Sequence, residues 1–442
     1  MRLRSLVLFF FLTTLNSLMG ADPDPALNEA LRQALDPGSA RSAATPWPEA
    51  LLKADPTVLR KTLKEKTFLP VSVSDVLALT LQDPPQAIFR DLEDVPADHR
   101  AYLYTPDAPG LFPLVILPPY TGANAEALHG DAREWVKMGY GALVVPPRKV
   151  GDGWTAKPQE HDDILRLLRL ALLQTRADPD RVYLVGFSRG GHASWDVGLR
   201  HAERFAAISP SGGTTTHEGG FTLSGGVFLC NGMHLPALVG HGAKDAEAVV
   251  MGNRLARDYY LKQSWILDLH EDPNLGHGNP LTLEDALEFF NRHSRKTWPS
   301  QMDKVFNKPE FDGDGGWIQA LELSVPAFDF NAPLVMQAPI PKDRDERLKK
   351  NWATVRGQLA RVKGGVNGQT LRLETTRVKK IRVLLGPELV NMQEPVTVIV
   401  NSKALFKGQL GAQTTTPQNI LQGVWESGET SRIPEVELEL EL

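Results

Sequence analysis

A serine flanked by glycines is the sequence feature with the clearest chemical meaning. Residues 186–190 read Gly-Phe-Ser-Arg-Gly, and they follow the apolar run 182–185 without a break. Glycines on either side of a serine let a strand turn sharply into a helix, which holds the hydroxyl clear of the backbone. The first N–H groups of such a helix point toward the same place. The pattern therefore predicts that Ser188 is an activated nucleophile and that the N–H of Arg189 stabilises the negative charge that its attack creates.

A serine hydroxyl is a weak nucleophile until a base takes its proton, so a base and an orienting acid must come from elsewhere in the chain. When the serine lies on such a strand-to-helix turn, the acid and then the histidine follow it in the sequence. Asp245 follows the apolar run 237–239, and His277 lies between two glycines in the loop after the run 265–269. We predict that Asp245 accepts a hydrogen bond from His277 and that His277 takes the proton of Ser188.

Other residues compete for the positions of the acid and the base. Asp272 is a second acid in the loop before the candidate histidine, and Asp245 could instead cap the helix that follows it. For two of the other histidines, one at the end of a strand and one before the acid, we expect hydrogen bonds to the backbone instead of a role as the base. The competing histidines are His234, His241 and His270.

The loop after the apolar run 114–117 is expected to supply a second donor to the developing negative charge. It begins Pro118-Pro119-Tyr120-Thr121, and because proline has no N–H, the donor is the backbone N–H of Tyr120 or of Thr121. Tyr120 could instead line the substrate pocket. The side chain of Arg189 could bind a substrate carboxylate or pair with a neighbouring acid.

Two clusters of histidine and acidic residues were considered as metal sites. His161 and Asp163 stand at the start of a predicted helix, where acids are favoured, and no second ligand group follows at metal spacing. Asp312 and Asp314 could begin a calcium loop, but Leu323 occupies the position of its bidentate glutamate. We therefore predict no metal and no cofactor.

Apolar runs bounded by turn residues alternate with amphipathic segments from about residue 101 to residue 294. Short continuous apolar runs are typical of strands that are buried on both faces, so the pattern predicts an α/β fold with a doubly wound, mainly parallel sheet. Residues 178–181 (Asp-Pro-Asp-Arg) are expected to form a sharp connector. The expected strands are 114–117, 142–145, 182–185, 206–208, 237–239 and 265–269, and the expected helices are 125–138, 159–174, 190–201, 248–261 and 283–293.

Three further segments flank the predicted catalytic domain, residues 96–298. Residues 1–21 contain two arginines, an apolar block and a small-residue end, which predicts a secretory signal peptide. Residues 22–95 form a proline-rich helical segment, with helices expected at 25–35 and 55–66. Residues 299–442 are predicted to be a β-rich accessory domain, with a two-residue hairpin turn at Asn401-Ser402 and an alternating tail. Its expected strands are 317–323, 353–362, 370–375, 381–385, 396–400, 403–409 and 435–442.

Composition narrows the class of partner and the cellular location. The formal net charge is −5 and no basic patch is present, so we expect no nucleic-acid partner. The apolar block at the start is shorter than the roughly 20 residues of a membrane span, and no later run reaches that length. We therefore expect a secreted or periplasmic protein without a membrane span. One cysteine, Cys230, allows no intramolecular disulfide.

Residues 101–296 resemble the α/β-hydrolase superfamily. The strongest likeness is to secreted esterases of the polyhydroxybutyrate-depolymerase and feruloyl-esterase type and to the catalytic domain of prolyl-oligopeptidase-like peptidases. The resemblance implies the same three residues, with Ser188 as nucleophile, Asp245 as acid and His277 as base. It departs at 118–120, where these esterases commonly carry a His-Gly-Gly type of sequence. The matching segments are 180–191, 204–209, 241–245 and 276–277.

The expected function is hydrolysis of a small-molecule or polymer-derived ester. A peptidase of the resembling kind usually carries a large β-propeller before its catalytic domain, and the segment 22–95 is too short for one. The insert 211–232 is short and glycine-rich, which favours an open site without a large lid. A serine peptidase is the first alternative, and an inactive hydrolase fold used for binding is the second. The complete order of serine, acid and histidine argues against the second alternative.

Overall fold

The computed structural model describes residues 24–36, 45–69, 75–80, 100–107, 109–123, 125–148, 153–154, 158–215, 224–330, 338–411 and 414–442. The predicted signal peptide therefore lies outside the described residues. Within these ranges, no helix combines the length and the apolar character that crossing a bilayer would require.

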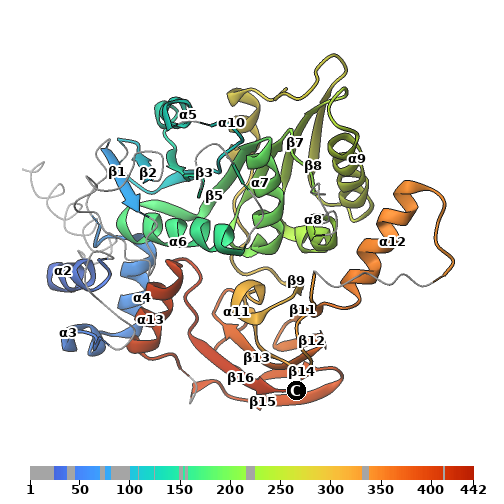
Figure 1. Cartoon of the computed structure of the whole chain (residues 1–442). Coiled ribbons are helices and arrows are strands. Elements are labelled where there is room, and N and C mark those ends of the chain that lie inside the picture. Colours follow the sequence, from blue (N-terminus) through green and yellow to red (C-terminus); the bar gives the residue numbers. More distant parts are fainter. Residues whose placement is uncertain are drawn as a thin grey trace, which may run out of the picture.

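An eight-stranded sheet forms the centre of the molecule, in the order β1-β2-β4-β3-β5-β6-β7-β8 (Figure 1). The strands from β4 to β8 in that order are parallel neighbours, whereas β1 and β2 form an antiparallel edge. The six predicted strands are confirmed. The bounds are β1 (Asp75–Thr80), β2 (Arg100–Thr105), β3 (Phe112–Leu117), β4 (Gly141–Val144), β5 (Ala177–Phe187), β6 (Ala207–Ser211), β7 (Ala237–Gly242) and β8 (Leu267–Asp272).

Two local predictions about this sheet were wrong. β1 lies in the segment that was expected to be helical, because its short apolar run, residues 76–79, does not by itself distinguish a strand from a helix. The expected connector at 178–181 lies inside β5. Proline is tolerated near the first residue of a strand, and Asp178 here accepts the backbone N–H of Asp180 at 2.9 Å, which satisfies a donor beside Pro179.

Helices cover both faces of the sheet, as the alternating pattern predicted. Alternate residues of β5 face opposite ways: Tyr183 stacks on Phe290 of α10 at 4.2 Å, and Leu184 lies in the core cluster that includes α6 and α7. In Figure 1, α6 and α7 lie in front of the sheet. The helices are α5 (Ala125–Lys137) and α10 (Leu283–Asn291) on one face and α6 (Pro158–Gln174), α7 (Arg189–Arg200) and α9 (Glu247–Lys262) on the other.

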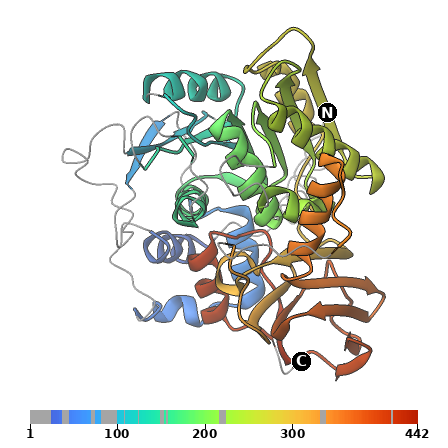
Figure 2. The ribbon, with the colours of Figure 1, turned by 45° about the vertical axis from the view of Figure 1, so that its right-hand side comes forward.

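The two expected N-terminal helices are present as α2 (Pro25–Ala34) and α4 (Pro56–Glu65), with the short α3 (Glu49–Leu52) between them. Asp24 and Asp55 cap α2 and α4, each before a proline in the first turn, which suits helix starts. Their leucines pack against α13 (Pro417–Ser427), close to the other end of the chain. Figures 1 and 2 show these blue and red helices side by side.

A buried lysine holds this helical layer to the sheet domain. Lys66 is fully buried, and its Nζ donates to the carbonyl oxygens of Leu172 at 2.6 Å and Ala177 at 2.7 Å. Burial lowers the pKa of Lys66 to about 7. The ammonium stabilises carbonyl groups at the C-terminal end of α6, where a cation is favoured.

The predicted β-rich C-terminal region contains two sheets, in the orders β10-β13-β16 and β15-β14-β12-β11-β9. The hairpin is confirmed: Asn401 and Ser402 have φ of 48° and 69°, as a turn with two left-handed residues requires. The alternating tail pairs with β13. The strands are β9 (Gln301–Phe306), β10 (Ile318–Leu323), β11 (Ala360–Asn367), β12 (Thr370–Thr376), β13 (Val378–Leu385), β14 (Val396–Val400), β15 (Lys403–Gly408) and β16 (Val436–Glu441).

Three of the helices described in this region were not predicted, and the first of them is the short α11 (Pro309–Asp312). α12 (Arg344–Arg356) overlaps the first residues of the expected strand 353–362, which was wrong there. Its thirteen residues are mostly charged or polar, and only Trp352 and Val355 are buried, so no clear apolar stripe marks it. α13 (Pro417–Ser427) begins at a capping threonine, Thr416, followed by proline.

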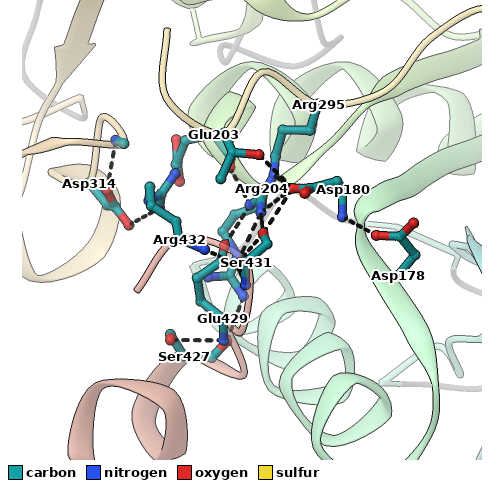
Figure 3. Close-up of polar contacts among 12 residues, drawn as sticks. Asp178, Asp180, Glu203, Arg204, Arg295, Asp314, Ser427, Glu429, Ser431 and Arg432 are labelled. Atoms are coloured by element: carbon teal, nitrogen blue, oxygen red, sulfur yellow. Dashed lines mark hydrogen bonds and ion pairs between the residues drawn. The ribbon is translucent and has the colours of Figure 1, made fainter. Parts of the chain in front are cut away.

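A buried network of ion pairs joins the chain after α13 to the sheet domain (Figure 3). Arg295 is buried and donates to Glu429 at 2.6 Å and to Asp180, near the start of β5, at 2.8 Å. Arg204 donates to the carbonyl oxygen of Ser427 at 2.5 Å. Burial alone would raise the pKa of the Glu429 carboxyl, but Arg295 and its neighbours hold that pKa well below the ordinary value of 4.5.

Glu429→Gln should destabilise the protein by about 3 kcal/mol at pH 7, because it leaves a buried guanidinium with one carboxylate fewer. Since the pKa of Glu429 is lowered in the folded state, its contribution is present above pH 4.5 and is lost as the pH falls toward the folded-state pKa. Denaturant unfolding of both proteins at pH 7 and below pH 4.5 measures this. Glu426→Gln, an exposed residue of α13, is the control and should change stability by less than about 0.5 kcal/mol. An equal loss from Glu429→Gln at both pH values would contradict the assignment.

Candidate active site

Ser188 lies on a strained turn between β5 and α7. Its φ is 55° and its ψ is −117°, a conformation that L-residues rarely adopt. A Cβ on Gly186 would lie 2.1 Å from the carbonyl oxygen of Gly190, and a Cβ on Gly190 would lie 2.7 Å from that of Pro118. Both glycines are therefore required by close backbone contacts, and the predicted strand-to-helix turn is present.

Ser188, His277 and Asp245 form one series of hydrogen bonds. The Nε2 of His277 lies 2.8 Å from the Oγ of Ser188, and its Nδ1 lies 2.9 Å from a carboxylate oxygen of Asp245. Asp245 lies in the turn after β7, and its side chain is 3 % exposed, whereas that of His277 is 50 % exposed. With Nδ1 protonated, His277 donates to Asp245 and accepts from the serine hydroxyl. The imidazole is then ready to take the serine proton.

Three of the four competing residues have hydrogen-bond partners elsewhere. Asp272 accepts the backbone N–H of Asn274 at 2.8 Å, so its carboxylate shapes a turn. His241 is fully buried with Nε2 2.9 Å from the carboxylate of Glu271, so the expectation of a backbone partner was wrong for this histidine. His270 is exposed on β8. Its side chain has no hydrogen bond to the backbone of the described residues, so the same expectation was wrong for His270. The Nε2 of His234 lies 2.7 Å from the carbonyl oxygen of Gln301.

Gly153 and Trp154 join the predicted donor loop to the start of α7. The N–H of Trp154 donates to Pro119 at 3.3 Å, and the guanidinium of Arg189 donates to the carbonyl oxygen of Trp154 at 3.1 Å. Arg189 thus has a backbone partner that neither of its two predicted roles included. Gly153 has φ of +65°, and a Cβ there would lie 2.7 Å from the nitrogen of Thr121. Sequence reasoning missed Gly153, because no motif surrounds it.

Gly153→Ala should slow the labelling of Ser188 by a fluorophosphonate about 10- to 100-fold, because the new methyl group displaces the backbone at Thr121. The matched control is Gly139→Ala. Gly139 also has positive φ, +82°, but a Cβ there meets nothing within 4 Å. Both variants should lose about 1 kcal/mol of stability from backbone strain, and only the first should lose reactivity. Similar labelling rates in the two variants would show that Gly153 does not position the loop.

A cavity of about 280 Å³ opens beside the turn that carries Ser188, on the face of the sheet that α5 and α10 cover. Tyr120 and Phe187 line it, with ring centroids 6.1 Å apart, and the ring of Phe187 lies 5.1 Å from that of His277. Burial, and then the nearby charge of Asp131, raises the pKa of Tyr120. Of the two roles considered for Tyr120, this position supports the lining of a substrate pocket. Gly186 and Phe187, the two residues before Ser188, also line the cavity, which therefore lies next to the candidate nucleophile.

The residues considered as metal ligands have structural partners. The Nε2 of His161 lies 2.9 Å from Asp196, and Asp163 accepts from Arg148 at 2.5 Å. Asp312 accepts the backbone N–H of Asn307 at 3.0 Å. Within the described ranges, no group of three or more histidine, cysteine, aspartate and glutamate side chains is arranged to hold a metal ion.

The strand order, the helices on both faces and the serine on the turn after β5 together decide the fold. The chain has the α/β-hydrolase fold. Ser188 lies where that fold places a nucleophile, at the carboxyl edge of the parallel strands. Asp245 and His277 follow at the same edge, after β7 and β8.

No family model and no curated protein matches the sequence. Among solved structures, the chain is similar to the acylaminoacyl peptidase of Pyrococcus horikoshii, with 16% identity and a TM-score of 0.37, over 45% of this chain and 40% of that one. A thermostable esterase has 19% identity and a TM-score of 0.36, with coverage of 50% and 63%. An α/β hydrolase from a Medee basin deep-sea metagenome has 16% identity and a TM-score of 0.32, over 40% of this chain and 78% of that one. The chain thus spans less than half the length of the peptidase. Because these TM-scores are low, the fold assignment rests on the strand order and on the strand-to-helix turn at Ser188.

Proposed function

We propose that the chain is a serine hydrolase that cleaves a carboxylic ester through an acyl-enzyme on Ser188. The observation that carries the proposal is the hydrogen-bonded series from Ser188 through His277 to Asp245, with the serine on a strained turn at the sheet edge. A strained backbone persists only where the surrounding structure enforces it, and such residues cluster at reacting sites.

In the proposed reaction, His277 takes the proton of the Ser188 hydroxyl as its oxygen attacks the ester carbonyl carbon. Asp245 stabilises the resulting imidazolium. The carbonyl oxygen becomes negatively charged and accepts hydrogen bonds from the N–H of Arg189 and from that of Tyr120 or Thr121. The C–O bond to the leaving alcohol then breaks, and His277 gives that alcohol its proton. Water attacks the acyl-enzyme by the same steps and releases the acid.

An ester is favoured over a peptide by the openness of the site. The His277 side chain is half exposed, so the proposed base can be reached from solvent. Alcohols leave more readily than amines, so an open site suits the easier reaction. The segment 216–223, between β6 and the short α8 (Ser224–Val227), lies outside the described residues. Serine peptidase activity remains the second candidate function, because the same series of groups can also cleave amides.

Export is part of the proposal and rests on residues 1–21 alone. The protein would act in the periplasm or outside the cell after removal of this segment. N-terminal sequencing of protein expressed with its full leader tests this directly, and a mature chain that still begins at Met1 would contradict export.

Ser188→Ala should abolish labelling by a fluorophosphonate and reduce hydrolysis of p-nitrophenyl acetate and butyrate to background. The fold should be kept, because alanine removes only the hydroxyl. Ser194→Ala, at a hydroxyl that donates to the Gly190 carbonyl oxygen within α7, is the control and should still label. Wild-type activity in Ser188→Ala would refute the proposed nucleophile.

Asp245→Asn should lower kcat about 10⁴-fold, because an amide can donate to Nδ1 and thereby favours the wrong tautomer of His277. Its control is Asp272→Asn, at the last residue of β8, where the carboxylate holds the turn that precedes His277. That variant should retain activity within a few-fold. If the two variants behaved in the opposite way, Asp272 would be the orienting acid.

A matched panel of p-nitrophenyl esters and the corresponding p-nitroanilides separates the two candidate functions. We expect kcat/KM for the esters to exceed that for the anilides by orders of magnitude. Comparable values would favour the peptidase. Labelling without turnover of either series would favour a hydrolase fold that serves in binding.

A further inference from the structure

The cavity beside Ser188 has two polar groups on its wall that no protein group satisfies. Ser209, on β6, is 3 % exposed, and its hydroxyl has no hydrogen-bond partner among the described residues, although it lines the cavity. Asp131, on α5, lines the same cavity and has no ion-pair or hydrogen-bond partner among those residues. The Ser209 hydroxyl is reachable from the cavity, so a molecule bound there can supply the partner that the described residues do not.

Asp131 is exposed to solvent, and no described lysine, arginine or histidine pairs with its carboxylate. Glu134, the other acid that lines the cavity, is paired with Lys137 at 2.5 Å. None of the described residues that line the cavity is lysine, arginine or histidine. Burial raises the pKa of Asp131, and no neighbouring cation opposes that effect. Tyr120 lines the same cavity, and after burial the charge of Asp131 is the second cause of its raised pKa.

We propose that this cavity binds an ammonium group of the substrate, with Asp131 as its counter-ion and the Ser209 hydroxyl as a hydrogen-bond acceptor. The substrate class is then an ester that carries an amine on one side of the scissile bond. The assignment of a substrate rests on the proposed function, whereas binding of the ammonium group does not.

An ammonium group satisfies this wall better than a neutral polar group does. It has three donors and no acceptor, so it can donate both to a carboxylate and to a hydroxyl oxygen. It also supplies the positive charge that the wall lacks. The aromatic faces of Tyr120 and Phe187 favour a cation as well. A sugar hydroxyl could donate to the same oxygens, but it would leave the charge of Asp131 uncompensated.

The test compares n-butylammonium with 1-butanol, which places a hydroxyl where the amine stood. Binding to the Ser188→Ala protein is measured by ligand-observed NMR titration, so that the result does not depend on turnover. We expect butylammonium to bind at least tenfold more tightly than butanol. Asp131→Asn, in the same background, should reduce that ratio to near one. Glu134→Gln, whose carboxylate already has a partner, should leave the ratio above about fivefold.

Equal binding of the two compounds to the Ser188→Ala protein would overturn the proposal. Tighter binding of butanol would do the same and would point to a neutral polar group. An unchanged ratio in Asp131→Asn would remove Asp131 as the counter-ion. Fluorophosphonate labelling of the wild type is scored separately, so loss of the proposed hydrolase function and loss of the ammonium site are distinguishable.

The substrate side of the proposal is tested with two matched ethyl esters. Ethyl 4-aminobutyrate and ethyl pentanoate differ only in an ammonium group that replaces a methyl group. Aminopropyl butyrate and butyl butyrate make the same comparison on the alcohol side. We expect one of the two pairs to show at least a tenfold higher kcat/KM for the cationic member, and Asp131→Asn to remove the difference. No preference in either pair, in an enzyme that hydrolyses the neutral esters, would contradict the substrate assignment.

Discussion

The candidate site depends on how closely three strand ends approach one another around Ser188. The positive φ of this serine is held by backbone contacts that leave no room for a side chain. A Cβ on Gly186 would overlap the turn itself, one on Gly190 would overlap the end of β3, and one on Gly191 would lie 2.4 Å from the carbonyl oxygen of Ser211 on β6. The strain at one residue is therefore balanced by packing of the strands on either side of β5. This explains why the candidate nucleophile, the loop after β3 and the cavity wall all meet at one edge.

The C-terminal region stabilises the same helix from its other end. α7 carries Ser188 at its start and Arg200 in its last turn, and Arg200 donates to the buried carboxylate of Asp312 at 3.0 Å. Lys304 of β9 donates to the carbonyl oxygen of Arg200. Trp352 of α12 packs directly on Gly226 in α8. These contacts and the ion pairs of Arg295 join the C-terminal region to the sheet domain. They are consistent with a region that supports the sheet domain.

The residues that follow a chemical motif could be predicted, and those that meet only in the folded chain could not. Ser188, Asp245 and His277 were found from their order after apolar runs, because parallel strands bring their carboxyl ends to one edge. Gly153 and Asp131 belong to segments without a motif, and their importance comes from neighbours far away in the sequence. The charged helix α12 and the antiparallel β1 were missed for a related reason. α12 has no apolar stripe, and the four-residue apolar run of β1, residues 76–79, is too short to distinguish a strand from a helix by its periodicity.

The charges on the two sides of the nucleophile bear on rate as well as on binding. In the proposed reaction, a negative charge develops on the substrate oxygen as Ser188 attacks, and Asp131 lies on the wall of the adjoining cavity. Like charges repel in a partly desolvated site, so an empty or neutral cavity leaves the transition state with an unfavourable neighbour. An ammonium group bound there neutralises Asp131 before the oxyanion forms. If the cavity binds an ammonium group as proposed, a cationic substrate gains more in the transition state than in the ground state, and the preference is expected in kcat as well as in KM.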